Sequence, residues 1–312
     1  MASLWCKATS AASARLMGEH AVLRKGPALV FSLNPRMTVF ARLLDREEHV
    51  ITSKFGEERI ARLDISLEGS HRFIKACLLE CLDSIPQGIE LHVSADFEHT
   101  VGLGSSAAVV AATIGAIKEL TNGVVDKREC LLLAQKAIRA VQGDGSGADA
   151  AASIFGGVLL FYQDGCFVQK LADTLPLHLA YSGMKTPTKE VIAHIQKMEK
   201  ANPERFQKIF SSINVLTLEA VQSIEKKDLQ QFGYLLNKAH EQMVLMGLEN
   251  EPLADLRKIF LQDASVMGCK ISGSGLGDCL VLLAQKLSPA SKKQCLPLNP
   301  DSRGLETETF TQ

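Results

Sequence analysis

Apolar residues recur at two different spacings along the chain, and the spacing changes from one region to the next. Alternating or continuous apolar runs bounded by Gly, Pro and polar turns predict strands. Apolar residues three or four positions apart predict amphipathic helices, each with one buried stripe. The predicted strands cover residues 21–33, 38–44, 89–94, 157–162, 177–182, 270–271 and 279–283. The predicted helices cover residues 70–84, 105–121, 126–141, a shorter segment from about 148, 189–199, 203–226, 229–246 and 252–263.

The order of these elements indicates the fold class. A β-rich beginning is followed by helices, and helices and strands return in the second half, without regular alternation of the two. This order favours an α+β fold over a doubly wound α/β sheet. With 312 residues the chain is long enough for two domains, which we expect over residues 1–172 and 173–312. Residues 288–312 are polar and contain Pro, so their order is left open.

Composition and charge narrow the function classes. Lys and Arg (34) nearly balance Asp and Glu (35), so no global field draws the protein to nucleic acid or to an anionic membrane. The eight cysteines are scattered without metal-site spacing, which is typical of reduced thiols in a cytoplasmic protein. Neither a signal peptide nor an apolar run of membrane-spanning length is recognisable. We therefore expect a small-molecule partner, no nucleic acid and no membrane.

Residues 102–108 read Gly-Leu-Gly-Ser-Ser-Ala-Ala and open a predicted Ala-rich helix. Glycines let a backbone approach an anion closely, and a helix N-terminus presents unpaired N–H groups and the positive end of the dipole. Ser105 and Ser106 can add hydroxyl donors or a metal ligand. The stretch is a candidate phosphate site, although no Gly-Lys-Ser/Thr follows it. Taken alone, it also suits a glycine turn with a serine helix cap.

Two further stretches change the interpretation. Residues 18–23 read Gly-Glu-His-Ala-Val-Leu, and residues 270–279 read Lys-Ile-Ser-Gly-Ser-Gly-Leu-Gly-Asp-Cys and lead into an apolar strand. Each alone suits a structural role, the second as a hairpin or bulge loop. Together, in this order and at these separations, the three stretches resemble the motifs of the GHMP kinases, and the resemblance covers nearly the whole chain.

The resemblance implies a two-domain GHMP kinase fold with the active site in the cleft between the domains. The N-terminal ATP-binding domain would be a mixed α/β domain like domain 2 of ribosomal protein S5, and the C-terminal domain a ferredoxin-like α+β domain. ATP and Mg²⁺ are the implied cofactors, with Ser106 as a magnesium ligand. The implied ATP-binding residues are Gly102, Leu103, Gly104, Ser105, Ser106, Ala107, Gly273, Ser274 and Gly275.

The segment Gly-Ser-Gly-Ala-Asp at residues 145–149 resembles the family segment whose Asp lies by the acceptor hydroxyl. Asp149 is therefore the candidate general base, because a carboxylate within hydrogen-bond reach of an alcohol can take its proton during phosphoryl transfer. A helix cap is the alternative role for Asp149, and equally for Thr188 in the implied interdomain loop. The substrate-binding residues that the resemblance implies are Glu19, His20, Ser146, Lys185 and Thr188.

Two positions depart from the family pattern. Mevalonate kinases usually carry a Lys five residues before the Gly of Gly-Glu-His, where this chain has Ser13. If this segment is a strand, Arg15 shares a face with Ser13, and we expect Arg15 to supply the missing catalytic cation. The family's magnesium-binding Glu falls on Ile138, which leaves the metal to Ser106, phosphate and water, with Asp144 as a substitute carboxylate.

The acceptor remains open between two families of this group. Gly-Glu-His resembles mevalonate kinases, which phosphorylate the 5-hydroxyl of mevalonate, whereas the ending Gly-Asp-Cys at residues 277–279 resembles phosphomevalonate kinases. A substrate phosphate could be met by four cations: Arg15, Arg24, Lys25 and Lys185.

The two departures from the family pattern also allow a nucleotide-binding homologue with little or no turnover. An interaction module built on the helices of residues 189–263 fits less well. A homodimer is the family-level expectation.

Overall fold

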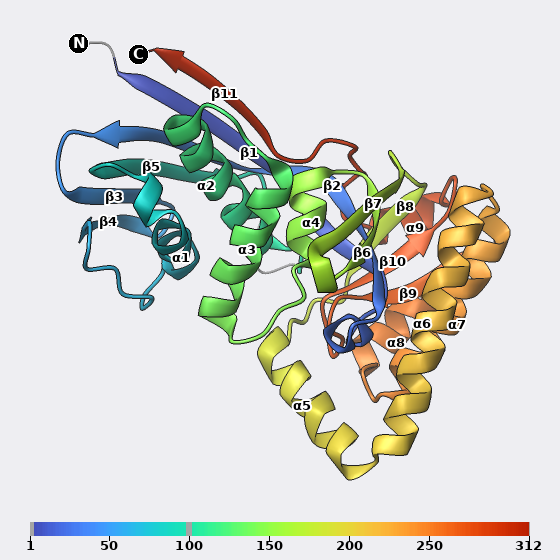
Figure 1. Cartoon of the computed structure of the whole chain (residues 1–312). Coiled ribbons are helices and arrows are strands. Elements are labelled where there is room, and N and C mark those ends of the chain that lie inside the picture. The colour runs from blue at the N-terminus through green and yellow to red at the C-terminus, as the bar shows by residue number, and fades with distance from the viewer. Residues whose placement is uncertain (1–2, 98–101, 312) are drawn as a thin grey trace.

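The protein folds around two β-sheets, a large one built mainly from the first half of the chain and a small one from the second half (Figure 1). The computed structural model describes residues 3–97 and 102–311. Within these residues the large sheet has eight strands in the order β11-β1-β2-β5-β3-β4, and β2 also pairs with β6, which pairs with β7. The strands are β1 (Leu4–Met17), β2 (Pro27–Leu44), β3 (Glu48–Ser53), β4 (Gly56–Ala61), β5 (Gly88–Ala95), β6 (Val158–Tyr162), β7 (Phe167–Ala172) and β11 (Glu306–Thr311).

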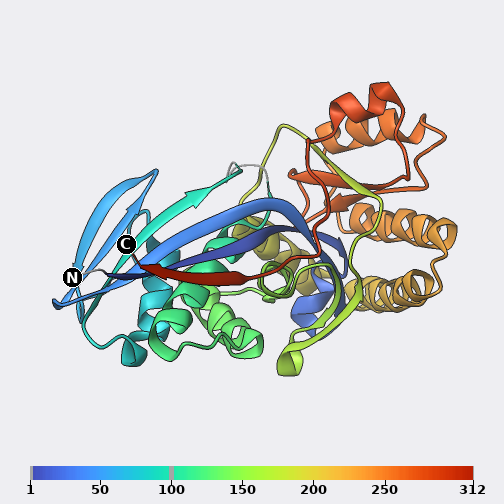
Figure 2. The same cartoon turned by 90° about the horizontal axis from the view of Figure 1, so that it is seen from above.

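Helices α1 to α4 cover one face of the large sheet, as Figures 1 and 2 show from two directions. The central helix, α2 (Ser105–Asn122), packs on β1 and β2 and against the other three helices. Its small residues Ala107, Ala108 and Ala111 are buried, so the helix can lie close to the sheet. The N-terminus of α2 therefore meets β1, where Ser13 N donates to Leu103 O over 3.1 Å. The other helices of this layer are α1 (Arg72–Glu80), α3 (Lys127–Gln142) and α4 (Ala148–Phe155).

The small sheet has the strand order β8-β10-β9, with antiparallel pairing throughout. Helix α7 lies directly on β9. The two elements come so close at Gly233 that a side chain would not fit there, since a Cβ atom would stand 2.5 Å from Met267 O. Helix α6 packs on α7. The elements are β8 (Leu177–Tyr181), β9 (Gly268–Ser272), β10 (Cys279–Leu283), α5 (Thr188–Ala201), α6 (Pro203–Glu225), α7 (Leu229–Leu245), α8 (Glu251–Leu261) and α9 (Pro289–Gln294).

Every predicted helix is present, with its ends shifted by at most a few residues, and the α+β class is confirmed. Asp126 caps α3, accepting from the backbone N–H groups of Arg128 and Glu129. Thr188 is the first residue of α5, but Pro187 is the N-cap. Gly147 occupies the N-cap of α4, and Asp149 lies in the first turn instead. Neither Thr188 nor Asp149 is therefore a capping residue.

The prediction of one strand over residues 21–33 was wrong at its start. Ala21–Arg24 is a 3₁₀ turn, and β2 begins at Pro27. The strand then continues without a break to Leu44, because Asn34 and Pro35 sit in a bulge where the pairing with β1 shifts. A bulge tolerates Pro, since no ladder hydrogen bond is required there. The sequence pattern did not predict β1, β3, β4, β7 and β11. Several of these strands carry polar residues on both faces, so they lack the alternation of apolar and polar positions that predicts a strand.

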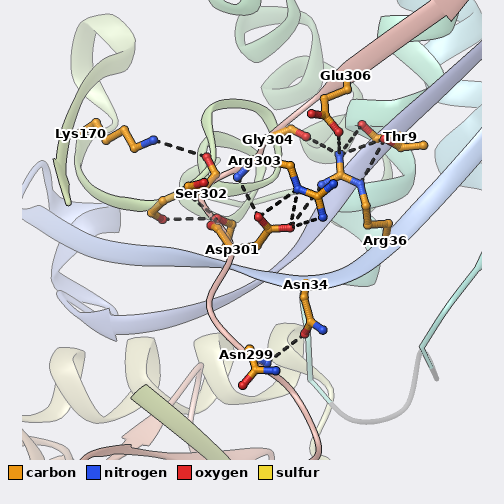
Figure 3. Close-up of polar contacts among 12 residues, drawn as sticks. Thr9, Asn34, Arg36, Lys170, Asn299, Asp301, Ser302, Arg303, Gly304 and Glu306 are labelled. Atoms are coloured by element: carbon orange, nitrogen blue, oxygen red, sulfur yellow. Dashed lines mark hydrogen bonds and ion pairs between the residues drawn. The ribbon is translucent and has the colours of Figure 1, made fainter. Parts of the chain in front are cut away.

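The polar tail, whose order the sequence left open, forms α9 and then returns to the large sheet as β11, antiparallel to β1. Arg36, which is 8% exposed, anchors this return (Figure 3). Its guanidinium donates to Gly304 O over 2.5 Å and to the hydroxyl of Thr9 over 2.9 Å. It also lies 3.3 Å from the Glu306 carboxylate and 3.8 Å from that of Asp301. One buried cation thus joins β1, β2 and the segment before β11.

Within residues 3–97 and 102–311, no helix is long and apolar enough to cross a lipid bilayer. Every cysteine lies in the described part of the chain and is a free thiol, six of them buried. Burial raises the pKa of several of these thiols, for example that of Cys269 to about 12. Six of the eight cysteines are therefore core residues, and those whose pKa is raised carry little thiolate at neutral pH.

Replacing Arg36 by Leu should lower the free energy of unfolding by about 3 kcal/mol, because it leaves the Gly304 carbonyl without its donor and removes the buried cation that lies near the carboxylates of Asp301 and Glu306. Urea unfolding followed by circular dichroism measures this change. The matched control is Arg59→Leu, since Arg59 pairs with Glu57 on the surface and its loss should leave stability nearly unchanged. Equal stability of the two variants would contradict the anchoring role of Arg36.

Candidate functional site

A cleft lies between the two sheet units, lined by segments far apart in the sequence. From the first unit it receives the end of β1, the loop that follows, and the N-termini of α2 and α4. From the second unit it receives the loop before α5 and the glycine-rich loop between β9 and β10. The predicted site residues that line it are Arg15, Glu19, His20, Gly102, Gly104, Ser105, Ser106, Ala107, Ser146, Asp149, Lys185, Thr188, Gly273 and Ser274.

The N-terminus of α2 points its backbone N–H groups at this cleft. Its N-cap is Gly104, in the left-handed conformation at φ 66°, so no capping side chain accepts from the first turn. A Cβ atom at Gly104 would stand 2.2 Å from the Ser13 hydroxyl, which means that only glycine lets β1 come so close. Gly102, at φ 73°, needs the same freedom. This is the geometry of an anion site at a helix N-terminus.

Arg15 of β1 and Asp149 of α4 form an ion pair on the first unit's side of the cleft, with 2.8 Å between a guanidinium nitrogen and Oδ2. β1 is a strand here, and Ser13 and Arg15 pair with Ser32 and Val30 of β2, so the condition for a shared face is met. The Asp149 side chain is 40% exposed and open to a ligand. The backbone of Arg15 is fixed by Ser272, whose hydroxyl accepts from Arg15 N over 3.2 Å and donates to Arg15 O over 2.9 Å.

Glu19 faces the cleft, but its carboxylate is already paired with Lys270 of β9, and both side chains are almost fully buried. Burial lowers the pKa of Lys270, and the charge of Glu19 offsets part of that effect. Sequence reasoning gave Lys270 no role, although a lysine inside an apolar strand is itself a signal, since a buried ammonium needs a partner. Glu19 therefore shapes the cleft wall rather than offering a free carboxylate.

His20 lies beside this pair in the left-handed conformation, at φ 60°. Its Nε2 donates to Ser274 O over 2.9 Å, because a carbonyl can only accept, and this leaves Nδ1 as the acceptor. Burial lowers the pKa of His20 to about 4. The imidazole is therefore neutral at physiological pH and connects the loop after β1 to the loop after β9.

Some predicted residues do not reach the cleft. The Leu103 side chain is buried in the core, and Gly275 packs against Leu248, whose Cβ would lie 2.7 Å from a Cβ at position 275. Arg24 pairs with Glu199 and stacks on Phe210. Lys25 is 78% exposed and lies 3.2 Å from Asp164. The cations that do line the cleft among the described residues are Arg15 and Lys185.

Magnesium would find few protein ligands here. Ile138 lines the cleft with an apolar side chain, and the described residues contain no group of three His, Cys, Asp or Glu side chains that could hold a metal ion. A metal that keeps waters and phosphate oxygens needs only one or two protein ligands. Three buried polar atoms of cleft residues lack a partner in the described part of the chain: Arg15 Nε, Ser274 Oγ and Asp278 Oδ1. Such atoms fit a polar, charged ligand.

Asp278 is a cleft residue that sequence reasoning recorded only as part of a motif. It is 6% exposed and follows the last glycine of the loop between β9 and β10. Burial raises its pKa to about 6, an effect that the nearby Asp149 carboxylate increases and Lys185 reduces. The signal in the sequence is a single acidic residue among glycines, directly before an apolar strand.

A second cavity of about 410 Å³ adjoins the cleft and shares Ser105 and Ser106 with it. Its wall includes Phe73, Val93 and Phe97. One side is braced by a chain of hydrogen bonds in which His71 contacts Ser53 and Glu58, each over 2.8 Å. The N-terminus of α2 thus stands between a polar cleft and a mainly apolar cavity.

Comparison with known proteins identifies the class. The model of the GHMP kinases N terminal domain matches residues 72–157, and that of the GHMP kinases C terminal domain matches residues 220–295. A protein of Archaeoglobus fulgidus is 31% identical over 298 residues, which cover 94% of this chain and 96% of that protein. The chain therefore belongs to the GHMP kinases and is a phosphotransferase of this ATP-using family. The relative from Archaeoglobus fulgidus bears the name mevalonate kinase.

Solved structures share the fold. Mevalonate kinase of Methanococcus jannaschii is similar with a TM-score of 0.76 and 19% identity, over 98% of this chain and 96% of that one. Phosphomevalonate kinase of Streptococcus pneumoniae, in complex with phosphomevalonate and AMPPNP, is similar with a TM-score of 0.77 and 16% identity, over 94% and 99%. The two scores are nearly equal, so the fold alone does not choose the acceptor. The predicted family and its two-part kinase fold are confirmed.

The ligand-free protein should lose stability as the pH falls from about 6.5 towards 4. In this pH range the imidazole of His20 takes up a proton in the unfolded chain. In the folded protein, where its pKa is about 4, it stays neutral. Chemical unfolding at several pH values should therefore show a shallower pH dependence for His20→Asn, a residue that tolerates the left-handed backbone. The exposed His194→Asn is the control. An unchanged slope in His20→Asn would contradict the neutral, buried state of His20.

Proposed function

We propose that the protein transfers the γ-phosphate of ATP to the 5-hydroxyl of mevalonate. The observation that carries this proposal is the Arg15–Asp149 pair in the cleft that the N-terminus of α2 faces. It brings a carboxylate able to accept a hydroxyl proton and a cation able to meet a phosphoryl group to one place. The name of the Archaeoglobus fulgidus relative and the motif Gly-Glu-His support the choice of acceptor.

The nucleotide would bind across the N-terminus of α2. Backbone N–H groups of residues 104–107 and the hydroxyls of Ser105 and Ser106 would hold its phosphates, and Gly273 and Ser274 would close on them from the second unit. The apolar cavity of about 410 Å³ is large enough to take the base. Leu103 and Gly275 would contribute only through backbone and packing.

The Ser106 hydroxyl would help to hold magnesium, which neutralises charge on the phosphates when bound. Asp149 Oδ2 would accept the proton of the acceptor hydroxyl. The Arg15 guanidinium, held by Ser272 through the backbone, orients Asp149 and would stabilise negative charge on the transferring group. Lys185, Thr188 and Ser146 line the same cleft and would contact the acceptor.

Phosphomevalonate is the second candidate acceptor, supported by the Gly-Asp-Cys ending of residues 277–279. Two of the four cations expected to meet its phosphate are engaged elsewhere, Arg24 with Glu199 and Lys25 with Asp164. Arg15 is paired with Asp149. The cleft therefore offers fewer cations for the phosphate of phosphomevalonate than the sequence indicated. This favours mevalonate as the acceptor. We also propose that the protein is a homodimer, as the family resemblance implies, and that it lies in the cytoplasm, as the reduced cysteines indicate.

Purified protein should release ADP from MgATP in the presence of mevalonate, but not of phosphomevalonate, homoserine or galactose. Asp149→Asn should reduce kcat by at least about 100-fold, because the amide cannot accept the proton. ATP-induced thermal stabilisation of this variant shows that the fold and the nucleotide site survive. Asp255→Asn, which removes an exposed carboxylate paired with Lys258, is the control. Turnover on phosphomevalonate alone would move the activity to that acceptor, and ATP binding without turnover on any acceptor would refute catalysis.

Arg15→Ala should reduce kcat by about 100- to 1,000-fold, as expected for loss of one charged donor at the reacting group. Arg15→Lys should recover part of this loss, because it restores the cation without the planar guanidinium. Steady-state kinetics with mevalonate measure both variants. Full turnover in Arg15→Ala would refute the idea that Arg15 replaces the family lysine absent at Ser13.

A further inference from the structure

The backbone of Asp278 is held rigidly in a conformation that costs free energy. Asp278 N donates to Met184 O over 2.7 Å, and its carbonyl accepts from Ser182 N over 2.9 Å. Its φ is 64°, in the left-handed region that residues other than glycine occupy rarely, with Asp and Asn the main exceptions. Strain of this kind persists where the surrounding structure enforces it, and it is concentrated at functional sites.

The carboxylate of Asp278 lies between the two glycine-rich loops of the cleft. A Cβ atom at Gly102 would stand 2.7 Å from Oδ1, and one at Gly273 would stand 3.4 Å from Oδ2. The residue is 6% exposed, and Oδ1 has no hydrogen-bond partner among the residues that the structure describes. A buried carboxylate oxygen without a partner is costly in the protein alone. The cost is removed if a ligand supplies the missing partner.

A phosphate bound at the N-terminus of α2 would come close to this carboxylate, since Asp278 adjoins Gly102 at the start of the phosphate loop. Two negative groups in a partly buried cleft repel each other strongly unless a cation lies between them. Magnesium prefers this combination of ligands, carboxylate and phosphate oxygens completed by water. The position of Asp278 is therefore unfavourable for a bare nucleotide and favourable for a nucleotide with its metal.

The other carboxylates that line the cleft are already engaged. Glu19 is paired with Lys270, and Asp149 is paired with Arg15. Asp144 accepts from the backbone N–H of Gly145 over 2.7 Å and is exposed. Ile138, at the position of the family's metal-binding glutamate, has no ligand atom.

We propose that Asp278 is the carboxylate ligand of the divalent cation that accompanies ATP, in place of the glutamate that is Ile138 in this chain. The inference rests on the proposed nucleotide site at the N-terminus of α2. It makes the second unit, through the loop between β9 and β10, a partner in metal binding. Asp144, which the sequence suggested as a substitute, is not needed for it.

The test measures metal binding directly, with Mn²⁺ as the probe and its electron paramagnetic resonance signal reporting free Mn²⁺. Full-length protein with ATP and no acceptor is titrated with Mn²⁺, and ATP affinity is measured separately in EDTA. Asp278→Asn should weaken Mn²⁺ binding to the protein–ATP complex by at least about tenfold. ATP affinity in EDTA should be unchanged or higher, because a repelling charge is removed. Asp278→Gly, which suits a φ of 64°, should behave in the same way even if the Asn variant is unstable.

Asp144→Asn is the matched control and should retain the Mn²⁺ affinity of the unchanged protein. Loss of Mn²⁺ affinity in Asp144→Asn alone would overturn the inference, and so would Asp278 variants that bind Mn²⁺ as tightly as the unchanged protein; the latter result would assign Asp278 to an electrostatic pairing with Lys185. ATP binding that Mn²⁺ does not strengthen would also overturn it while leaving the nucleotide site intact. Failure of the unchanged protein to bind ATP, with or without metal, would refute the proposed function and this inference together.

Discussion

The buried ion pair between Glu19 and Lys270 is the contact on which the cleft depends. It joins the loop after β1 to β9, so it crosses from the large sheet to the small one. Removing two charges from water is costly, and such a pair adds little net stability compared with apolar residues, but losing one partner leaves an uncompensated charge in the interior. The pair therefore acts as a constraint on arrangement. With the Arg15–Ser272 bonds, it fixes how the two halves of the site face each other.

Close backbone approach is the second constraint on the site. Gly104 lets β1 touch the N-terminus of α2, and Gly102 makes room for the carboxylate of Asp278. Because each glycine has no side chain, a polar side chain from a distant segment can lie close to the N-terminus of α2. Preorganised dipoles and charges are effective for phosphoryl transfer because they need no rearrangement when the reaction occurs. The arrangement follows from packing, since a side chain at Gly104 would meet that of Ser13, and one at Gly102 would meet that of Asp278.

The sequence predicted the parts of the structure that are encoded locally. Each helix carries its own apolar stripe, and each motif its own glycines, so both were visible without the fold. The ion pair of Glu19 with Lys270 was not visible, because its partners are 251 residues apart and neither segment signals the other. The same reason hid β11, which alternates Glu and Thr and becomes a strand only because β1 offers an edge. Leu103 and Gly275 belong to motifs that point to a ligand, yet their own contacts are with the core.

The pairing of β1 with β11 has a consequence for how the protein is made. Leu4 lies opposite Thr311, so the two ends of the chain meet in one sheet (Figure 1). On the ribosome, where domains usually fold as they emerge, β1 must wait with an open edge until β11, about 300 residues later, has been translated. The N-terminal half cannot complete its sheet before the C-terminal half exists. Truncated or stalled products would therefore expose a strand edge able to pair with other chains, which makes aggregation of unfinished molecules a hazard built into this topology.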